Sequence, residues 1–299
     1  MTAVRANGIA IEVETFGPKD GVPLLLIHGF GQQSIAWPDE FIEGFVRAGM
    51  RVIVYDNRDT GLSRKFDGQI PDFSAISAAM RAGRKPDVPY TLDDMAADAA
   101  GLLDALGIES AHVAGASMGG MIAQLVALNH TAKTRSLTTM FSTTGDAGLP
   151  PSSREAHLAL VTPPPGQDRA GVIAHVLKNH AAYGSTGFPL DDARSAEFVG
   201  RAYDRMYYPE GAMRHWSAIL SAPPRGKRLR SLKLPALVLH GSADALLPPA
   251  HGRSIAEAIP GAEYHEIAGW GHDLPAGVIP LLHGLMLPFI GKVEKERGA

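Results

Sequence analysis

Residues 115–120 read Gly115-Ala116-Ser117-Met118-Gly119-Gly120, a G-x-S-x-G pattern between an apolar, strand-like segment (residues 111–114) and a helix-like one (residues 118–128). A strand-to-helix turn this tight needs small flanking residues, because the chain folds back closely on itself, and it pushes the central side chain outward. The following helix points its free N–H groups at the same place, where they favour developing negative charge. The pattern therefore predicts that Ser117 is a nucleophile.

Strand and helix patterns alternate along most of the chain. Strands are expected at residues 24–27, 51–55, 137–141, 236–239 and 262–267, and an edge-type strand of alternating polarity at residues 9–16. Helices are expected at residues 91–106, which open on a capping-box pattern at Thr91, and at residues 250–259 and 278–290. This alternation predicts an α/β fold with a mostly parallel, doubly wound sheet.

One region interrupts the alternation. Between about residues 143 and 228 no buried strand is expected, and clustered prolines punctuate short helical pieces. We therefore expect an inserted helical cap at residues 143–228 and a discontinuous core at residues 1–142 and 229–299. Aromatic residues of the cap, among them Tyr207 and Trp216, recur near helical spacing and either join the cap to the core or line a pocket. The basic run at residues 225–230 is expected to be a solvated linker.

A serine hydroxyl needs a base to remove its proton, and the base needs an orienting partner. Asp244 follows the strand expected at residues 236–239, and the carboxyl ends of such strands are where open α/β sheets gather their sites. His272 lies in a glycine-rich loop after the strand ending near residue 267. The order Ser117, Asp244, His272 predicts a nucleophile, acid and base, with Asp146 as the alternative acid.

A fourth element, His28-Gly29-Phe30-Gly31, directly follows the apolar strand at residues 24–27. Attack on a carbonyl places negative charge on its oxygen, and a backbone N–H aimed at that oxygen contributes about 3 kcal/mol or more in a dry site. The N–H groups of Phe30 and Met118 are the expected donors of this oxyanion hole.

These motifs together resemble the α/β-hydrolase family over nearly the whole chain: HGFG (28–31), DNRDTGLS (56–63), GASMGG (115–120), HGSADALLP (240–248) and GWGHDLP (269–275). In the family's D-x-R-G-x-G-x-S loop, Asp59 and Thr60 replace the more usual Gly and its neighbour. We expect Asp56, Arg58 and Asp59 to hold this loop together by hydrogen bonds. The RDTG form and the WPDEF stretch (37–41) are similar to methylesterases of aromatic polyketide esters, which implies a carboxylic-ester hydrolase acting on a fairly bulky ester.

The residues near these motifs favour a small to medium, apolar ester, with Trp270, Leu246, Tyr207 and Trp216 as pocket candidates. Serine as nucleophile indicates acyl transfer, unlike the aspartate of dehalogenases and epoxide hydrolases. Asp273 follows His272, where carbon–carbon bond hydrolases usually carry Trp. The same machinery suits a lactonase, a thioesterase or a cofactor-free haloperoxidase, and a non-catalytic ligand-binding module is a further alternative.

Bulk composition excludes several other classes. The chain has 299 residues, a formal net charge of −3 and no cysteine, so no attraction to nucleic acid, no disulfide and no thiolate chemistry is expected. No signal-peptide pattern opens the chain, and its apolar runs are too short to span a bilayer. We expect a cytoplasmic enzyme with a small-molecule partner, needing neither cofactor nor metal, and with no sequence feature that specifies an oligomeric state.

Overall fold

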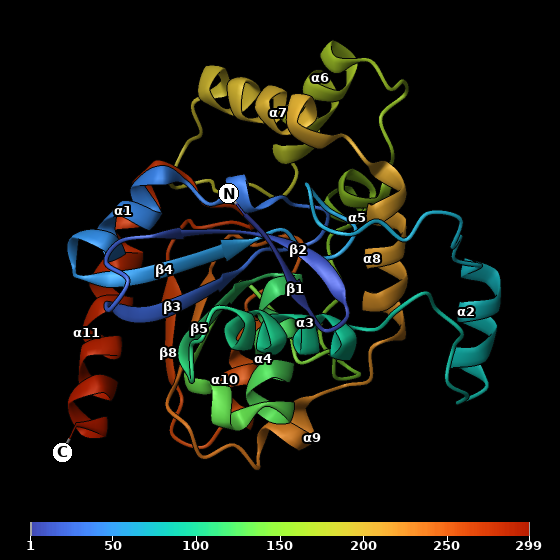
Figure 1. The fold of residues 1–299 in the computed structure, drawn as a ribbon. Helices are drawn as coiled ribbons and strands as arrows, with labels where there is room; N and C mark the ends of the chain where they lie inside the picture. The colour runs from blue at the N-terminus through green and yellow to red at the C-terminus, as the bar shows by residue number, and fades with distance from the viewer. Residues whose placement is uncertain (1, 299) are drawn as a thin grey trace.

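The computed structural model describes residues 2–298, which form an eight-stranded sheet with helices on both faces (Figure 1). The strands are β1 (Thr2–Ala6), β2 (Ile9–Phe16), β3 (Val22–Ile27), β4 (Met50–Tyr55), β5 (Ala111–Ala116), β6 (Thr134–Met140), β7 (Ala236–Gly241) and β8 (Glu263–Ile267). Their order across the sheet is β1-β2-β4-β3-β5-β6-β7-β8, with β2 antiparallel to both neighbours and all other pairs parallel. The predicted mostly parallel sheet is confirmed.

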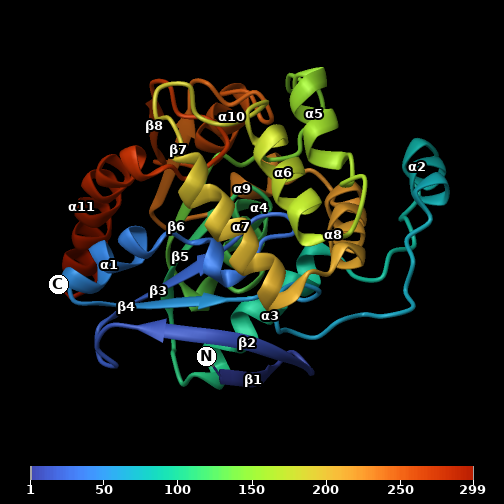
Figure 2. The ribbon, with the colours of Figure 1, turned by 90° about the horizontal axis from the view of Figure 1, so that it is seen from above.

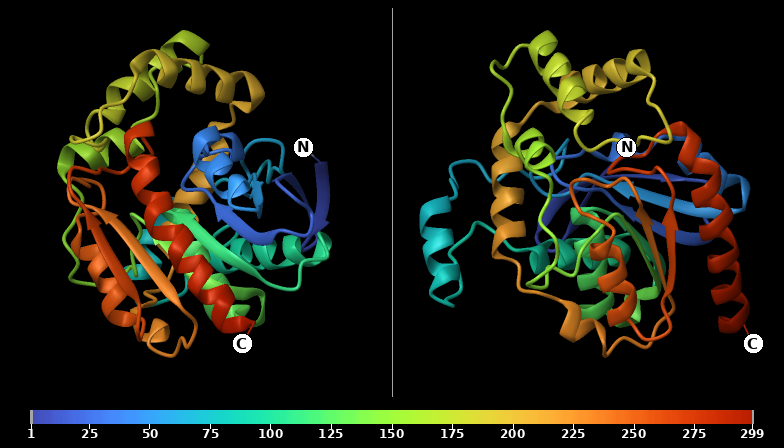
Figure 3. Two further views of the ribbon diagram at one scale, coloured as in Figure 1. Left: turned by 90° about the vertical axis from the view of Figure 1, so that its left-hand side faces the viewer. Right: turned by 180° about the vertical axis from the view of Figure 1, so that it is seen from behind.

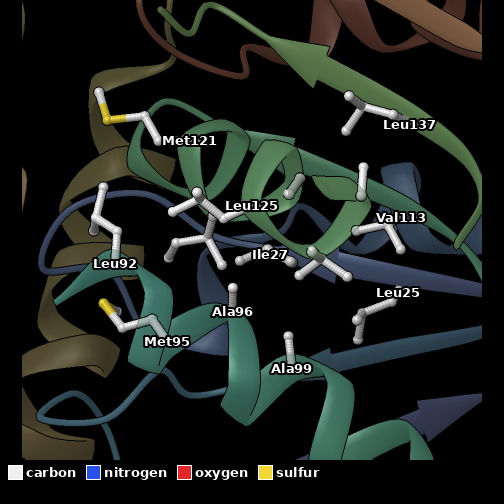
Figure 4. Packing of buried hydrophobic residues seen from close by; sticks show 14 of the residues in the cluster. Leu25, Ile27, Leu92, Met95, Ala96, Ala99, Val113, Met121, Leu125 and Leu137 are labelled. Carbon is white, nitrogen blue, oxygen red and sulfur yellow. The ribbon is translucent and has the colours of Figure 1, made fainter. Parts of the chain in front are cut away.

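Both faces of the sheet are covered because its central strands are apolar on both sides. In β3, Leu25 and Ile27 belong to one buried cluster, while Leu24 and Leu26 belong to the other. Helices α3 (Leu92–Ala105), α4 (Met118–Asn129) and α10 (Ala250–Ala258) cover the first face, where side chains from α3 and α4 meet those of β3 and β5 (Figure 4). Helices α1 (Asp39–Arg47) and α11 (Ile279–Arg297) cover the second.

The predicted capping box at the start of α3 is confirmed. The Thr91 hydroxyl accepts the Asp94 N–H at 3.3 Å, and the Asp94 carboxylate accepts the Thr91 N–H at 2.8 Å. Two N–H groups that the helix leaves unpaired are thereby satisfied.

The prediction of residues 9–16 as an edge strand is wrong in one respect. The span is right, but β1 forms a hairpin with β2 and takes the edge. As fits a strand with neighbours on both sides, the three central residues Ile11, Glu12 and Val13 are all buried despite the alternating polarity of the sequence.

Between β6 and β7 the chain contains five helices and no strand: α5 (Arg154–Val161), α6 (Arg169–His180), α7 (Asp192–Met206), α8 (Pro209–Ser221) and α9 (Gly226–Leu229). Helices α6 and α7 lie above the sheet, and α8 runs down beside it (Figures 1 and 3). Division into a cap at residues 143–228 stays a prediction. The solvated-linker expectation is wrong for Arg225, which is 2% exposed and donates to the carbonyl of Thr143 at 3.0 Å.

Helix α2 (Phe73–Arg81) was not expected and lies at the outer edge of the molecule between two long loops (Figure 2). Its Ile76 and Ala79 are buried, and the helix packs against α8.

The C-terminal helix is longer than the apolar run predicted at residues 278–290. Together with the preceding turn, Ala276–Arg297 is 22 residues long and contains an 18-residue window of mean hydropathy 1.5, which by length and composition alone suffices to cross a membrane. The expectation that every apolar run is too short is corrected to that extent. In the fold, one side of this helix is buried against the sheet through residues that include Leu282, Met286 and Phe289.

Candidate active site

Ser117 lies in the sharp turn between β5 and α4, with φ 56° and ψ −120°. Such a positive φ is strained in a residue with a side chain and is typical of functional turns. The turn closes only on glycines, because a Cβ at Gly115 would lie 2.1 Å from the Gly119 carbonyl oxygen and one at Gly119 would lie 1.9 Å from that of Ile27. The side chain of Ser117 is thereby presented at the carboxyl edge of the sheet.

Three residues predicted from separate motifs meet at this edge. His272 Nε2 lies 2.9 Å from Ser117 Oγ, and His272 Nδ1 lies 2.8 Å from Asp244 Oδ2. Asp244 comes from the loop after β7 and His272 from the loop after β8, two neighbouring parallel strands. The alternative acid Asp146 is instead an acceptor for the Gly226 N–H at 3.3 Å.

The carboxylate of Asp244 is held as an anion. Its Oδ1 accepts the N–H groups of Leu246 and Leu247 at 2.9 and 2.8 Å. Burial raises its pKa, but the nearby charge of His272 and hydrogen bonds from His240 and His272 outweigh burial, and the pKa lies well below its usual range. An anion beside Nδ1 keeps the proton on that nitrogen, so Nε2 faces Ser117 Oγ as an acceptor.

The two residues whose amides are the expected oxyanion donors are close to Ser117 in different ways: Met118 follows it directly, and Phe30 follows Gly29, where a Cβ would lie 3.2 Å from Ser117 Cβ. Within residues 2–298 neither N–H has a protein acceptor, and Met118 is the first residue of α4. The turn at residues 28–30 packs against the serine, since a Cβ at Gly29 would lie 3.7 Å from Ser117 Oγ.

Aromatic rings border the same region. Phe30 meets Trp216 edge-on with 5.8 Å between ring centroids, and Phe141 lies 4.7 Å from the His272 ring. Phe141 has φ 37°, a strained value for so bulky a residue. No sequence signal marked Phe141.

The four pocket candidates lie in different places. Trp216 contacts Phe30, and Leu246 is buried directly beside Asp244. Tyr207 stacks on Tyr203 at 4.8 Å within the α6–α7 layer. Trp270 is 0% exposed, and its indole N–H donates to the carbonyl of Asp273 at 2.7 Å, so its ring belongs to the core.

A segment between α6 and α7 holds the loop that carries His272. The His272 N–H donates to the carbonyl of Tyr183 at 2.8 Å, and the Gly271 N–H donates to Ser185 Oγ at 2.9 Å. Ser185 in turn donates its hydroxyl and its N–H to the carboxylate of Asp273. These contacts were not predicted from the sequence, because Tyr183 and Ser185 do not belong to any recognisable motif.

An open cavity of about 570 Å³ lies between the chain after β6 and the loop after β7. Its lining includes Thr143, Arg154, His157, Leu247 and His251. Ser117, Asp244 and His272 are not among its lining residues, although the lining residue Leu247 donates its N–H to Asp244 Oδ1 at 2.8 Å.

Comparison with known proteins agrees with this architecture. The model of the alpha/beta hydrolase fold family matches residues 22–275. The chain belongs to the α/β-hydrolase family. This α/β hydrolase is 32% identical to "Rhodomycin D methylesterase DauP" of Streptomyces sp. (strain C5), over 92% of this chain and 93% of the relative.

Two further relatives share the fold with this α/β hydrolase. It is 27% identical to "Putative non-heme bromoperoxidase BpoC" of Mycobacterium tuberculosis (strain ATCC 25618 / H37Rv), over 84% of this chain and 87% of the relative. The crystal structure of the enol-lactonase from Burkholderia xenovorans LB400 matches with a TM-score of 0.72 and 21% identity, over 97% and 100% of the two chains. The family match and the methylesterase relative that is 32% identical together show an enzyme of hydrolase type, and the binding-module alternative is set aside.

Proposed function

We propose that this protein is a serine carboxylic-ester hydrolase that works through an acyl-enzyme intermediate. The observation that carries the proposal is the continuous hydrogen-bonded line from Ser117 Oγ to His272 to Asp244, at 2.9 and 2.8 Å. A serine aligned with a neutral imidazole, itself oriented by a buried carboxylate, is the arrangement that nucleophilic acyl transfer requires.

In the first half-reaction, His272 Nε2 takes the proton of Ser117 Oγ as the oxygen attacks the ester carbonyl carbon. Asp244 stabilises the imidazolium, and the N–H groups of Phe30 and Met118 donate to the developing oxyanion. The intermediate collapses with cleavage of the bond to the alkoxy oxygen, which receives the proton from His272, and the alcohol leaves. The acyl group remains on Ser117.

In the second half-reaction, His272 takes a proton from water, and the resulting hydroxide attacks the acyl carbon. The oxyanion is held by the same two amides. Collapse of this intermediate breaks the bond to Ser117 Oγ, which regains a proton from His272, and the carboxylic acid is released.

For the substrate we favour a small to medium, apolar ester. The contact of Trp216 with Phe30 and the buried position of Leu246 support an apolar wall. The methylesterase name of a relative 32% identical supports a methyl ester. Tyr207 and Trp270 have no observed contact that supports a pocket role.

A panel of p-nitrophenyl esters of rising acyl length, together with methyl esters of aromatic acids, tests this proposal. We expect turnover that depends on acyl size and disappears in Ser117→Ala. The matched control is Ser231→Ala, since Ser231 is exposed, precedes β7, and its hydroxyl donates only to the nearby carbonyl of Arg228 at 2.8 Å. Turnover retained in Ser117→Ala would contradict the proposal.

A second candidate uses the same acyl-enzyme with a different acceptor. The relative named a putative non-heme bromoperoxidase favours hydrogen peroxide in place of water, which would release a peracid. Peroxide-dependent bromination in acetate buffer that outpaces ester hydrolysis would make this the main activity. Lactone and thioester substrates belong in the same panel, because the proposed triad chemistry serves them equally.

A further inference from the structure

Asp59 has two unusual properties. It occupies a left-handed conformation, with φ 66°, in the place where the resembled loop usually has glycine. Its carboxylate accepts two hydrogen bonds from the guanidinium of Arg214, at 2.8 and 3.0 Å. Both side chains are buried, with Asp59 0% and Arg214 3% exposed. The carboxylate of Asp59 therefore anchors α8 to the loop at residues 56–63.

The residue after Arg214 lies against the proposed oxyanion-hole loop. His215 is fully buried, with Nε2 2.8 Å from the carbonyl oxygen of Arg58 and Nδ1 3.2 Å from the N–H of Gly31. A carbonyl oxygen only accepts, so Nε2 carries the proton and Nδ1 presents its lone pair to Gly31. Burial lowers the pKa of His215 to about 4, which keeps this neutral tautomer in place near neutral pH.

Gly31 directly follows Phe30, whose N–H is a proposed oxyanion donor. Gly31 has φ 66°, a conformation that glycine adopts readily. Because Gly31 is exposed, protein contacts can fix this turn only from its inner side. The Phe30 ring contacts the rings of both His215 and Trp216, at 6.5 and 5.8 Å between centroids. Helix α8 thus contacts both the backbone and the side chain of the turn.

We propose that His215 is a positioning residue for the oxyanion hole, fixing the Phe30–Gly31 turn while the Asp59–Arg214 pair fixes α8. This inference rests on the proposed function of Phe30. Hydrogen-bond donors stabilise an oxyanion only when they already point to where it forms, and a displacement of about 1 Å costs about 100-fold in rate. Loss of the His215 bond therefore acts on the transition state more than on substrate binding.

Two substitutions separate the hydrogen bonds of His215 from its volume. His215→Phe fills the space and removes both bonds, whereas His215→Gln keeps one acceptor and one donor on an amide. With the best ester from the panel, we expect His215→Phe to lower kcat about 100-fold with KM changed less than threefold, and His215→Gln to recover much of kcat. The rate at which a fluorophosphonate labels Ser117 should fall in parallel, because its phosphoryl oxygen uses the same donors.

The matched control is Arg194→Ala. Arg194 on α7 pairs with Glu40 on α1 at 2.6 Å, an exposed contact between the helical layer and the core that is remote from Gly31. We expect this variant to keep the wild-type kcat. If His215→Phe does not fold, Arg214→Lys serves instead, since it keeps the charge but loses the paired geometry and should lower kcat about tenfold at unchanged KM.

Unchanged kcat in a folded His215→Phe, or a fall shared equally by Arg194→Ala, would overturn the positioning role. The proposed function fails in a different way, because wild-type protein would then show no Ser117-dependent turnover at all. The two outcomes are therefore distinguishable in one set of assays.

Discussion

At the scale of single residues, Ser117 is defined by a strained backbone and one well-placed hydrogen bond. Its φ of 56° is retained because glycines on both sides let the turn close. The sequence predicted this turn. It also predicted that Ser117, Asp244 and His272 meet, because each follows one of the parallel strands β5, β7 and β8, whose carboxyl ends lie at the same edge of the sheet. Their distances became known only from the structure.

Asp244→Asn tests the acid. An amide in this place favours the wrong imidazole tautomer, so we expect kcat to fall about 10⁴-fold while the fold is retained. The measurement is steady-state ester hydrolysis together with a thermal unfolding curve. The same substitution at Asp146 should leave kcat nearly unchanged, and the reverse ranking would assign the acid to Asp146.

The pH dependence of kcat/KM tests the base. A protonated imidazole cannot accept the serine proton, so activity falls on acidification as His272 becomes charged. Burial lowers the pKa of His28 and of His215 to about 4, so neither residue gains its proton above about pH 5. We expect the acid limb of kcat/KM to follow a single protonation; a rate that does not fall on acidification, with chemistry rate-limiting, would contradict the role of His272.

At the scale of elements, the helices between β6 and β7 hold both loops that carry the proposed machinery. Helix α8 binds the turn at Gly31 through His215, and the segment before α7 binds the His272 loop through Tyr183 and Ser185. None of this was predictable from the sequence, because these contacts join irregular segments far apart in the chain. Arg225 is a similar case, as its partners Gln124 and Thr143 lie 101 and 82 residues away.

Ser185→Ala tests the contact with the His272 loop. The change removes a donor to Asp273 and leaves the Gly271 N–H without its acceptor, so we expect the free energy of unfolding to fall by about 1–3 kcal/mol. A looser loop should also lower kcat about tenfold. Thr186→Ala, an exposed neighbour, is the control, and equal effects of the two changes would show that the Ser185 bonds are unimportant.

At the scale of the whole molecule, the enzyme is a sheet with a buried apolar cluster on each face. The alternation of strand and helix patterns predicted this layering, because strands buried on both sides need continuous apolar runs. The hairpin partner β1 and the peripheral helix α2 escaped prediction. The first is short and largely exposed, and the second lies in a long irregular connection.

Leu24→Ala and Leu25→Ala test this layering together, because the two side chains point to opposite faces of β3. Each should lower the free energy of unfolding by about 2–5 kcal/mol, since each leaves a cavity in a packed cluster. Chemical denaturation measures both. A loss for only one of them would mean that one face of the sheet is not packed as described.

The most direct test of the account is mass spectrometry of the protein after brief treatment with a fluorophosphonate. The proposed mechanism predicts one covalent adduct, located on the peptide that contains Ser117, and its near absence in His272→Ala. Labelling on another residue, or equal labelling of Ser117 without His272, would contradict a serine nucleophile activated by this base.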